Sequence, residues 1–305
     1  LYVCNQFDND VSVIDLAVGK EVARVPVKRE PVASAITPDG KLLFVGNLLP
    51  NDRADSYNVA THVTVIDTAT NKPESIRLPN GSGSLRGICV SPDGKYAYAV
   101  HILSRYAMPT TQLERGWINT NAMSIIDVAA KKLINTVLLD DIDLGGSNPW
   151  GVACTADSKK ICVTHAGTHE LSVIDAKGLM TKLPMMPDRP FSQLETEAEE
   201  KAANVFNDLS YLVKLRRRIR LPGGHWSKPL DPRKGKYEDI YFDCFTSGVC
   251  LSFVEPVVYA ASSGRGERVR CVVVVVDVRV VCERLYRIHA GVEGCRKCLP
   301  GSVGP

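Results

Sequence analysis

The chain has 305 residues, of which 45% are hydrophobic and 23% are charged, and its formal net charge is +3. This composition is that of a globular protein with enough apolar residues for a sizeable core. The small net charge gives no broad electrostatic field, so neither nucleic acid nor a membrane surface is predicted as a partner.

The sequence begins with Leu1 in a strand-like stretch, LYVCN, and lacks an initiating methionine. We therefore expect a fragment whose natural start, including any secretion signal, is missing. No apolar run reaches the 18 or so residues that a membrane-spanning helix needs, so no membrane span is predicted.

A short strand phrase occurs four times along the chain. It reads SVID, TVID, SIID and SVID, and it ends at Asp15, Asp67, Asp127 and Asp175. Between the copies lie the turn sequences TPDGK, SPDGK and TADSK, in which Pro fixes φ, Asp forms a local hydrogen bond and Gly takes a left-handed conformation. Four short strands in each repeat of about 50 residues are typical of the blades of a β-propeller.

We therefore predict an all-β fold, a partial β-propeller of about four to five four-stranded blades from a seven- or eight-bladed parent, with a helical insertion. The blades are placed in residues 1–225. With strands a to d running from centre to rim, the a–b and c–d hairpins lie on one face. The b–c and d–a loops lie on the other, which we name the loop-bearing face.

Two of the b–c loops are extended. From the end of strand b to the Asp of strand c there are 20 and 26 residues in the second and third repeats, against 10 in the first and fourth. Repeated insertion on one face points to a binding site there. The ligand-binding candidates are the ends of strand b, the starts of strand a and the loop arginines: Asn5, Asn47, His101, His165, Arg86, Trp150, Arg53, Arg105 and Arg115.

Strand b ends in Asn in the first two repeats and in His in the next two. Neutral imidazoles on neighbouring blades can bind a metal ion or an open haem position, or can shuttle a proton, so the metal candidates are His101, His165 and His169. The alternative is that each Asn or His closes its loop by hydrogen bonding to the backbone. No HExxH or GxSxG motif is present, and no catalytic residue is assigned.

The fourth repeat departs from the pattern after Asp175. Residues at about 188–215 show helical spacing of apolar positions, with Ser192 and Glu195 as a capping box. This helical insert in the c–d hairpin is expected to project from the face opposite the loop-bearing face. The arginines at 216–218 are interpreted as a solvated helix end, and the outer strand is expected to resume at 218–224.

Residues 226–305 are interpreted as a degenerate blade or as a divergent, disordered tail. Their Cys-x-x-Cys pair at 295–298 is followed by Leu299, where c-type haem attachment requires His, so no haem site and no other cofactor is predicted in this fragment. A zinc site made by the tail cysteines is a minor alternative. Four further cysteines lie in apolar strands and are interpreted as small buried thiols: Cys4, Cys89, Cys154 and Cys162.

The stretches LYVCN and LFVGN and the VID phrases resemble those of YVTN-type β-propeller repeat proteins, a WD40-like family of mostly exported bacterial and archaeal proteins. The stretch from GNLLPNDRADSYNVATHVTVIDT to NPWGVACTADSKK further resembles the propeller part of large exported proteins that end in a c-type cytochrome, peroxidase-like domain. The likeness covers roughly residues 1–225. It implies a periplasmic or extracellular location and a cytochrome c-type domain as partner, in the parent protein or in another protein.

What the resemblance implies about function is a non-catalytic scaffold that binds a ligand or a protein as the companion domain of an exported redox protein active in electron transfer. The alternative is an enzyme on the loop-bearing face, either a metal- or haem-dependent oxidoreductase that uses His101 and His165 or a lactonase-like propeller enzyme. An adhesive or surface-layer module is a third hypothesis. A binding role is favoured over catalysis in this fragment.

Overall fold

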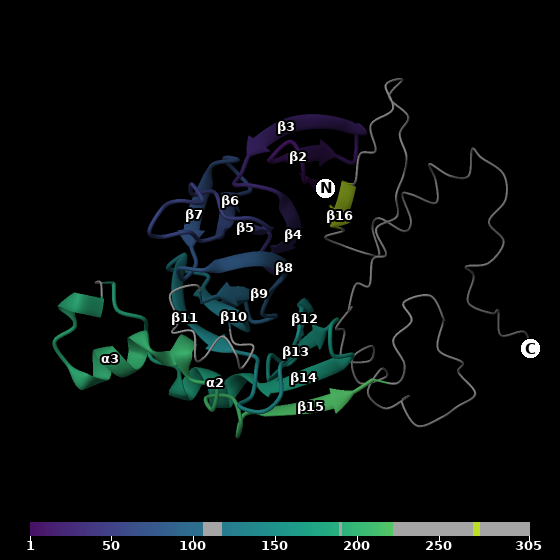
Figure 1. Cartoon of the computed structure of the whole chain (residues 1–305). Helices are drawn as coiled ribbons and strands as arrows, with labels where there is room; N and C mark the ends of the chain where they lie inside the picture. Colours follow the sequence, from purple (N-terminus) through teal and green to yellow (C-terminus); the bar gives the residue numbers. More distant parts are fainter. Residues whose placement is uncertain (106–117, 189–190, 222–270, 275–305) are drawn as a thin grey trace, which may run out of the picture.

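The computed structural model describes residues 1–105, 118–188, 191–221 and 271–274. Within these ranges sixteen strands form four antiparallel sheets of four strands each, arranged as successive blades (Figure 1). The predicted all-β fold of four-stranded propeller blades is therefore confirmed.

Blade 1 has the strand order β16-β1-β2-β3. Its strands are β16 (Cys271–Val274), β1 (Tyr2–Asn5), β2 (Asp10–Asp15) and β3 (Lys20–Pro26). Blade 2 comprises β4 (Pro31–Ile36), β5 (Leu42–Asn47), β6 (His62–Asp67) and β7 (Pro73–Arg77). Blade 3 comprises β8 (Ser82–Val90), β9 (Tyr96–Ser104), β10 (Asn119–Asp127) and β11 (Lys132–Leu138). Blade 4 comprises β12 (Pro149–Cys154), β13 (Lys160–His165), β14 (Glu170–Asp175) and β15 (Arg216–Arg220).

The innermost strand of blade 1 comes from the far end of the sequence. Strand β16 pairs antiparallel with β1, with Tyr2 opposite Val274 and Asn5 opposite Cys271. This segment therefore completes the first blade, where the sequence suggested a strand of a degenerate fifth one. The rest of that tail, residues 222–270 and 275–305, lies outside the described residues.

Alternating side chains of the central strands fill the spaces between the blades. On β5, Leu43 and Val45 belong to the cluster shared with blade 1, and Phe44 between them packs with residues of blade 3. On β9, Tyr98 and its neighbours at every second position face blade 4 in the same way. A strand with period-two alternation and both sides buried is what a central propeller strand requires.

The a–b turns share one hydrogen-bond pattern. A hydroxyl group two residues before the turn aspartate donates to its carboxylate at 2.6 Å, from Thr37 to Asp39 and from Thr155 to Asp157. The carboxylate also accepts a backbone N–H from two residues later, 3.0 Å away in the blade 4 turn. Ser158 holds the left-handed position, with φ of 56°. The variant turn TADSK therefore keeps the geometry that the sequence TPDGK predicts.

The insert contains less helix than predicted. Its helical elements are α2 (Ala176–Lys182), η1 (Phe191–Gln193), α3 (Glu197–Ala203) and η2 (Val205–Asn207). The capping box is formed by Thr196 and Glu199, and the predicted pair Ser192 and Glu195 was wrong. Helix α3 ends at Ala203, with Asn204 as its C-cap. Asn204 and the β-branched Val205 that follows it both have low helix propensity.

The insert also reaches the loop-bearing face, contrary to the prediction. It leaves and re-enters blade 4 on the opposite face, but its middle part follows the outer strand of blade 3. The Asn135 side chain on β11 donates to the carbonyl of Ala202 at 2.8 Å. The Phe206 carbonyl accepts from Arg105, which lies beyond the end of strand b.

The arginine run at 216–218 is not a solvated helix end. These residues begin β15, the outer strand of blade 4, which pairs with β14 from Arg216 to Arg220. The expected resumption of the outer strand is confirmed, and it begins two residues earlier than predicted. Among the described residues, every helix falls short of the length and apolarity that a membrane span would need.

Candidate functional site

The histidine at the end of strand b binds a hydroxyl group on strand c in blades 3 and 4. His101 Nε2 lies 2.8 Å from Ser124 Oγ, and His165 Nε2 lies 2.8 Å from Ser172 Oγ. Each serine is the first residue of the recurring SIID or SVID phrase. The imidazoles thus point along the sheet toward strand c.

Asparagine makes the same contact in blades 1 and 2. Asn5 Nδ2 donates to Ser12 Oγ at 2.8 Å, and Asn47 Nδ2 donates to Thr64 Oγ1 at 3.0 Å. The hydroxyl again belongs to the first residue of the phrase SVID or TVID. Asn and His therefore occupy equivalent positions and bind equivalent partners in all four blades.

The second ring nitrogen of each histidine is also engaged. His101 Nδ1 lies 3.1 Å from the Ile102 carbonyl, and His165 Nδ1 lies 2.7 Å from the Gly146 carbonyl. The two side chains are almost fully buried, at 0% and 2% exposure. Burial lowers the pKa of each imidazole to about 4, because removal from water disfavours the charged form. Both rings are neutral at physiological pH.

A metal ion at His101 or His165 would have to displace one of these hydrogen bonds. In the part of the chain that the structure describes, no group of three or more His, Cys, Asp and Glu side chains is placed to hold a metal ion. His169 is exposed and lies in the b–c turn of blade 4 with φ of 54°, like Asn9 in the corresponding turn of blade 1. Metal binding stays a prediction.

Arg86 and Trp150 come from neighbouring blades and meet near the axis. Arg86 lies on β8 and Trp150 on β12, and the guanidinium carbon is 4.3 Å from the centroid of the indole ring. A Cβ atom at Gly87 would overlap the Trp150 carbonyl oxygen, so glycine allows the two strands to approach. Trp150 is 43% exposed. This pair is an accessible cation–π contact between the innermost strands of blades 3 and 4; Trp150 lies at the start of its strand, but Arg86 lies in the middle of β8.

The other predicted arginines take different roles. Arg53 is exposed and forms an ion pair with an aspartate of its own b–c loop, with nitrogen and oxygen 2.7 Å apart. Arg105 donates to the Phe206 carbonyl at 2.8 Å and to the Asn207 side chain at 2.7 Å, which fixes the insert to blade 3. Burial lowers its pKa. Arg115 lies outside the described residues.

A cavity of about 510 Å³ opens beside the d–a loop that joins blade 3 to blade 4. It is lined by residues 119–121 at the start of β10, by loop residues 140–145 and 147, and by Leu209 of the insert. The Asp140 carboxylate accepts the backbone N–H of Asn121 at 2.7 Å and that of Gly146 at 2.5 Å. These bonds hold the loop against blade 3.

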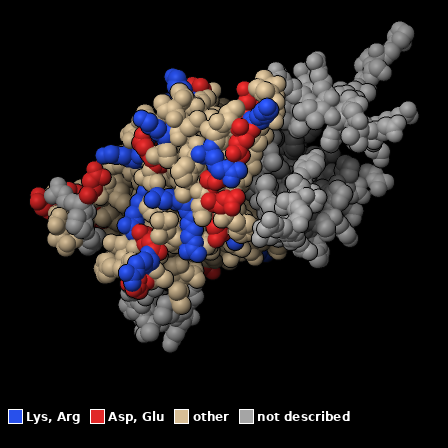
Figure 2. All heavy atoms as spheres, turned by 90° about the horizontal axis from the view of Figure 1, so that it is seen from above, with Lys and Arg blue, Asp and Glu red and all other residues tan. Residues whose placement is uncertain are grey.

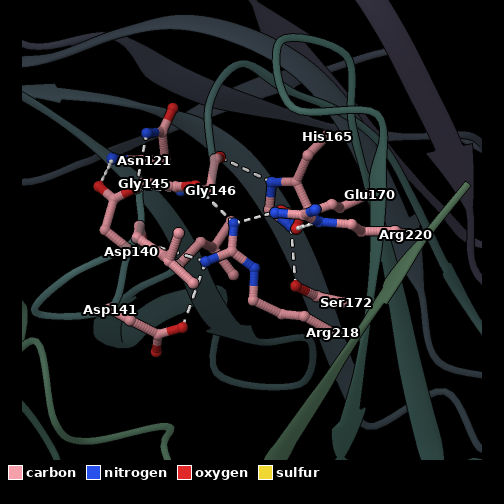
Figure 3. Close-up of polar contacts among 12 residues, drawn as sticks. Asn121, Asp140, Asp141, Gly145, Gly146, His165, Glu170, Ser172, Arg218 and Arg220 are labelled. Atoms are coloured by element: carbon pink, nitrogen blue, oxygen red, sulfur yellow. Dashed lines mark hydrogen bonds and ion pairs between the residues drawn. The ribbon is translucent and has the colours of Figure 1, made fainter. Parts of the chain in front are cut away.

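Buried arginines of β15 hold the same loop against blade 4 (Figure 3). Arg216 binds the Leu139 carbonyl and the Asp141 carboxylate, and its side chain is 2% exposed. Arg218 lies 3.2 Å from Asp141 and 2.5 Å from Glu170, with a side chain 11% exposed. The loop is therefore held from both sides by charged hydrogen bonds, which are among the strongest in proteins.

These contacts include residues that the sequence analysis missed. A signal for the hydroxyl partners was present, because Ser or Thr opens the phrase in all four copies. The network of Asp141 with Arg216 and Arg218 gave no such signal, since its members lie 75 to 77 positions apart and belong to no repeat.

Three comparisons place this fold among known proteins, although no protein-family model matches the chain. A stretch of 168 residues, 55% of the chain, is 29% identical to the beta subunit of hydrazine synthase from Kuenenia stuttgartiensis. Another of 100 residues, 32% of the chain, is 32% identical to antigen Lp49 of Leptospira interrogans. A solved structure of hydrazine synthase from Kuenenia stuttgartiensis is similar in fold, with a TM-score of 0.50 and 22% sequence identity. The superposition covers 72% of this chain and 70% of the hydrazine synthase chain.

The matched segments span 42% of the hydrazine synthase subunit and 22% of antigen Lp49, so the chain corresponds to less than half of either protein. The structural likeness supports the β-propeller fold. The more specific resemblance to YVTN repeats and the link to a cytochrome remain predictions.

Proposed function

We propose that the chain is a non-catalytic β-propeller domain that binds a protein partner through its loop-bearing face, as the companion domain of an exported redox protein. The sequence likeness to the hydrazine synthase beta subunit supports the redox context. The expected partner is a c-type cytochrome domain, in the parent protein or in another protein, and the expected location is periplasmic or extracellular.

The observation that supports a protein partner is the exposure of large apolar side chains on this face. Six of them lie in b–c loops, in a d–a loop or at the start of strand a, and all are at least 40% exposed: Phe7, Tyr57, Ile118, Ile142, Leu144 and Trp150. Aromatic and aliphatic side chains that gather on one face of a protein are typical of interaction surfaces, where aromatic residues supply much of the binding energy.

The polar candidates on the same face support binding over catalysis. The histidine and asparagine side chains at the ends of strand b are bonded to strand c within their own blades, where they stabilise the loops. The net charge of +3 gives no broad field, and basic and acidic side chains are interspersed on the side of the molecule seen in Figure 2. Contact with a partner would therefore depend on the apolar loop residues and on Arg86 with Trp150.

The test begins with the complete reading frame. A downstream Cys-x-x-Cys-His domain is expected, and a complete chain without one would remove the redox part of the proposal. The propeller and that cytochrome domain, expressed separately, are then titrated by calorimetry. Replacing Phe7, Tyr57 and Trp150 by Ser should weaken binding at least tenfold, because aromatic anchors each contribute about 1 kcal/mol or more.

The matched control lies on the other side of blade 1. Val18 and Val22 are 62% and 61% exposed in and after the c–d turn, away from the loop-bearing face. Their replacement by Ser should leave the affinity unchanged. Equal loss of affinity in both variants, or none in either, would contradict a site on the loop-bearing face.

A further inference from the structure

Two thiol groups meet in the space between blades 3 and 4. Cys89 on β8 and Cys154 on β12 lie 65 positions apart in the sequence, yet their Sγ atoms are 3.8 Å apart. Both residues pack in or against the same apolar cluster between the blades. From the sequence each cysteine is predicted to be an isolated buried thiol, because nothing in the repeat relates them.

The backbones that hold these thiols are fixed side by side. Strands β8 and β12 are the innermost strands of their blades and are in direct contact. Toward the loop-bearing face the same two strands are joined by Arg86 with Trp150 and by the close approach at Gly87. A disulfide has a sulfur–sulfur separation of about 2.05 Å, so oxidation requires the two sulfur atoms to move closer, by side-chain rotation between strands that are already in contact.

We propose that Cys89 and Cys154 form a redox site, an interblade disulfide made by exchange with a low-molecular-weight or protein disulfide. The proposal depends on the geometry of the two thiols and is independent of the proposed function. Two other cysteines differ from this pair: Cys4 is fully buried between blades 1 and 2, and Cys162 lies on β13.

The chemistry is a two-step exchange. A thiolate of the pair attacks one sulfur of the incoming disulfide, which forms a mixed disulfide and releases one small thiolate. The second cysteine then loses its proton and displaces the other small thiol. The protein dithiol is oxidised by two electrons, the incoming disulfide is reduced to two thiols, and the protons of the two cysteines end on the products.

Cys89 is the accessible member, since it is partly exposed whereas Cys154 is 8% exposed. The hydrogen bond with Cys154 and burial raise the pKa of the Cys89 thiol well above its ordinary value. Because the thiolate is the nucleophile, oxidation of the folded protein is expected to be slow at neutral pH and to accelerate roughly tenfold for each unit of pH increase below that pKa.

The bond would join the innermost strands of two blades that otherwise hold together by non-covalent packing. A disulfide that closes a loop of this length stabilises a domain mainly by restricting the unfolded chain. The oxidised protein should therefore melt roughly 5–15 °C higher than the reduced protein.

The experiment uses the full chain, divided between oxidised glutathione at pH 8.5 and dithiothreitol, with iodoacetamide to trap free thiols. Tryptic digestion separates the relevant cysteines, because Cys89 lies in peptide 87–95, Cys154 in 133–159 and Cys162 in 161–177. Mass spectrometry of the unreduced digest should show peptide 87–95 linked to peptide 133–159 in the oxidised sample and both peptides alkylated in the reduced one.

Matched variants complete the test. Cys89→Ser and Cys154→Ser should each remove the linked peptide and the redox-dependent melting shift, and Cys162→Ser should keep both. Where a serine variant fails to fold, Cys→Ala at the same position takes its place. Alkylation of both cysteines after oxidation, or linkage of Cys89 to Cys162 or to a cysteine of the tail, would overturn the proposal.

Discussion

His165 Nε2 and Ser172 Oγ lie 2.8 Å apart, and the same distance joins His101 to Ser124 one blade earlier. Since Asn5 makes the equivalent bond to a hydroxyl in blade 1, the change from Asn to His along the chain preserves one interaction. The position joins strand b to strand c just below the b–c loop. The side chain at this position therefore has a structural role in each blade.

This equivalence predicts that asparagine substitutes well for the two histidines. His101→Ala leaves the Ile102 carbonyl without its ring partner and creates a cavity, and should cost about 3 kcal/mol of unfolding free energy. His101→Asn gives Ser124 a hydrogen-bond partner again, with the amide donating to the hydroxyl as Asn5 does in blade 1, and should cost about half as much. Urea denaturation of both variants measures the difference. Equal costs would contradict a hydrogen-bonding role for the side chain.

Measuring the metal content of variants tests whether the same histidines bind a metal ion. The double variant His101→Asn, His165→Asn should retain the fold and contain as much metal as the wild type when analysed by mass spectrometry. His169→Asn tests the third candidate in the same way, because asparagine is tolerated at the left-handed turn position that Asn9 has in blade 1. Stoichiometric metal in the wild type that the double variant loses would instead favour the oxidoreductase alternative.

The buried histidines also predict acid sensitivity. Their pKa in the folded protein is about 4, below the ordinary value of 6.5. Between these two pH values the histidines are protonated in the unfolded chain but neutral in the folded one. The unfolding free energy is therefore unaffected by these rings above about pH 6.5. Between pH 6.5 and about 4 it decreases, by up to roughly 3 kcal/mol for each ring. Unfolding free energies measured from pH 7 to 4.5 should decline steeply in the wild type and less in the double Asn variant. Parallel curves would contradict this origin.

The sequence predicted this fold because propeller blades repeat locally. The phrase ending at Asp15 and its three later copies mark strand c, and the PDG turns mark the a–b hairpins, so four blades follow from residues close together in the chain. The candidate site was predicted in part. Arg86 and Trp150 were predicted at the start of strand a, but their contact was not, because it depends on the close approach of β8 and β12 at Gly87.

Contacts between distant and non-repeating segments could not be predicted in this way. The insert reaches Arg105 because its path along β11 depends on tertiary packing, and local helical spacing gives no information about that path. Likewise the arginine run at 216–218 has the composition of a solvated surface. Its side chains are buried only because Asp141 and Glu170 approach from other strands and loops.

The charged network of blade 4 should be costly to break. Asp141→Ala removes a carboxylate partner of both Arg216 and Arg218, and it should lower the unfolding free energy by about 3 kcal/mol because a buried guanidinium is left uncompensated. Glu197→Ala removes the exposed pair with Lys201 and should change stability by less than about 0.5 kcal/mol. Similar small effects in both variants would show that solvent compensates the buried arginines.

The approach of blades 3 and 4 depends on Gly87. A Cβ atom there would overlap the Trp150 carbonyl oxygen, a backbone atom that cannot move without displacing β12, so Gly87→Ala should cost about 2–3 kcal/mol. Gly83 lies on the same strand, and its Cβ would meet Pro50 at an ordinary 3.8 Å. Gly83→Ala is therefore the matched control and should leave the melting temperature nearly unchanged. If Gly87→Ala melts at the same temperature as the wild type, β8 and β12 have room to separate. The contact between Arg86 and Trp150 would then not require close packing of these two strands.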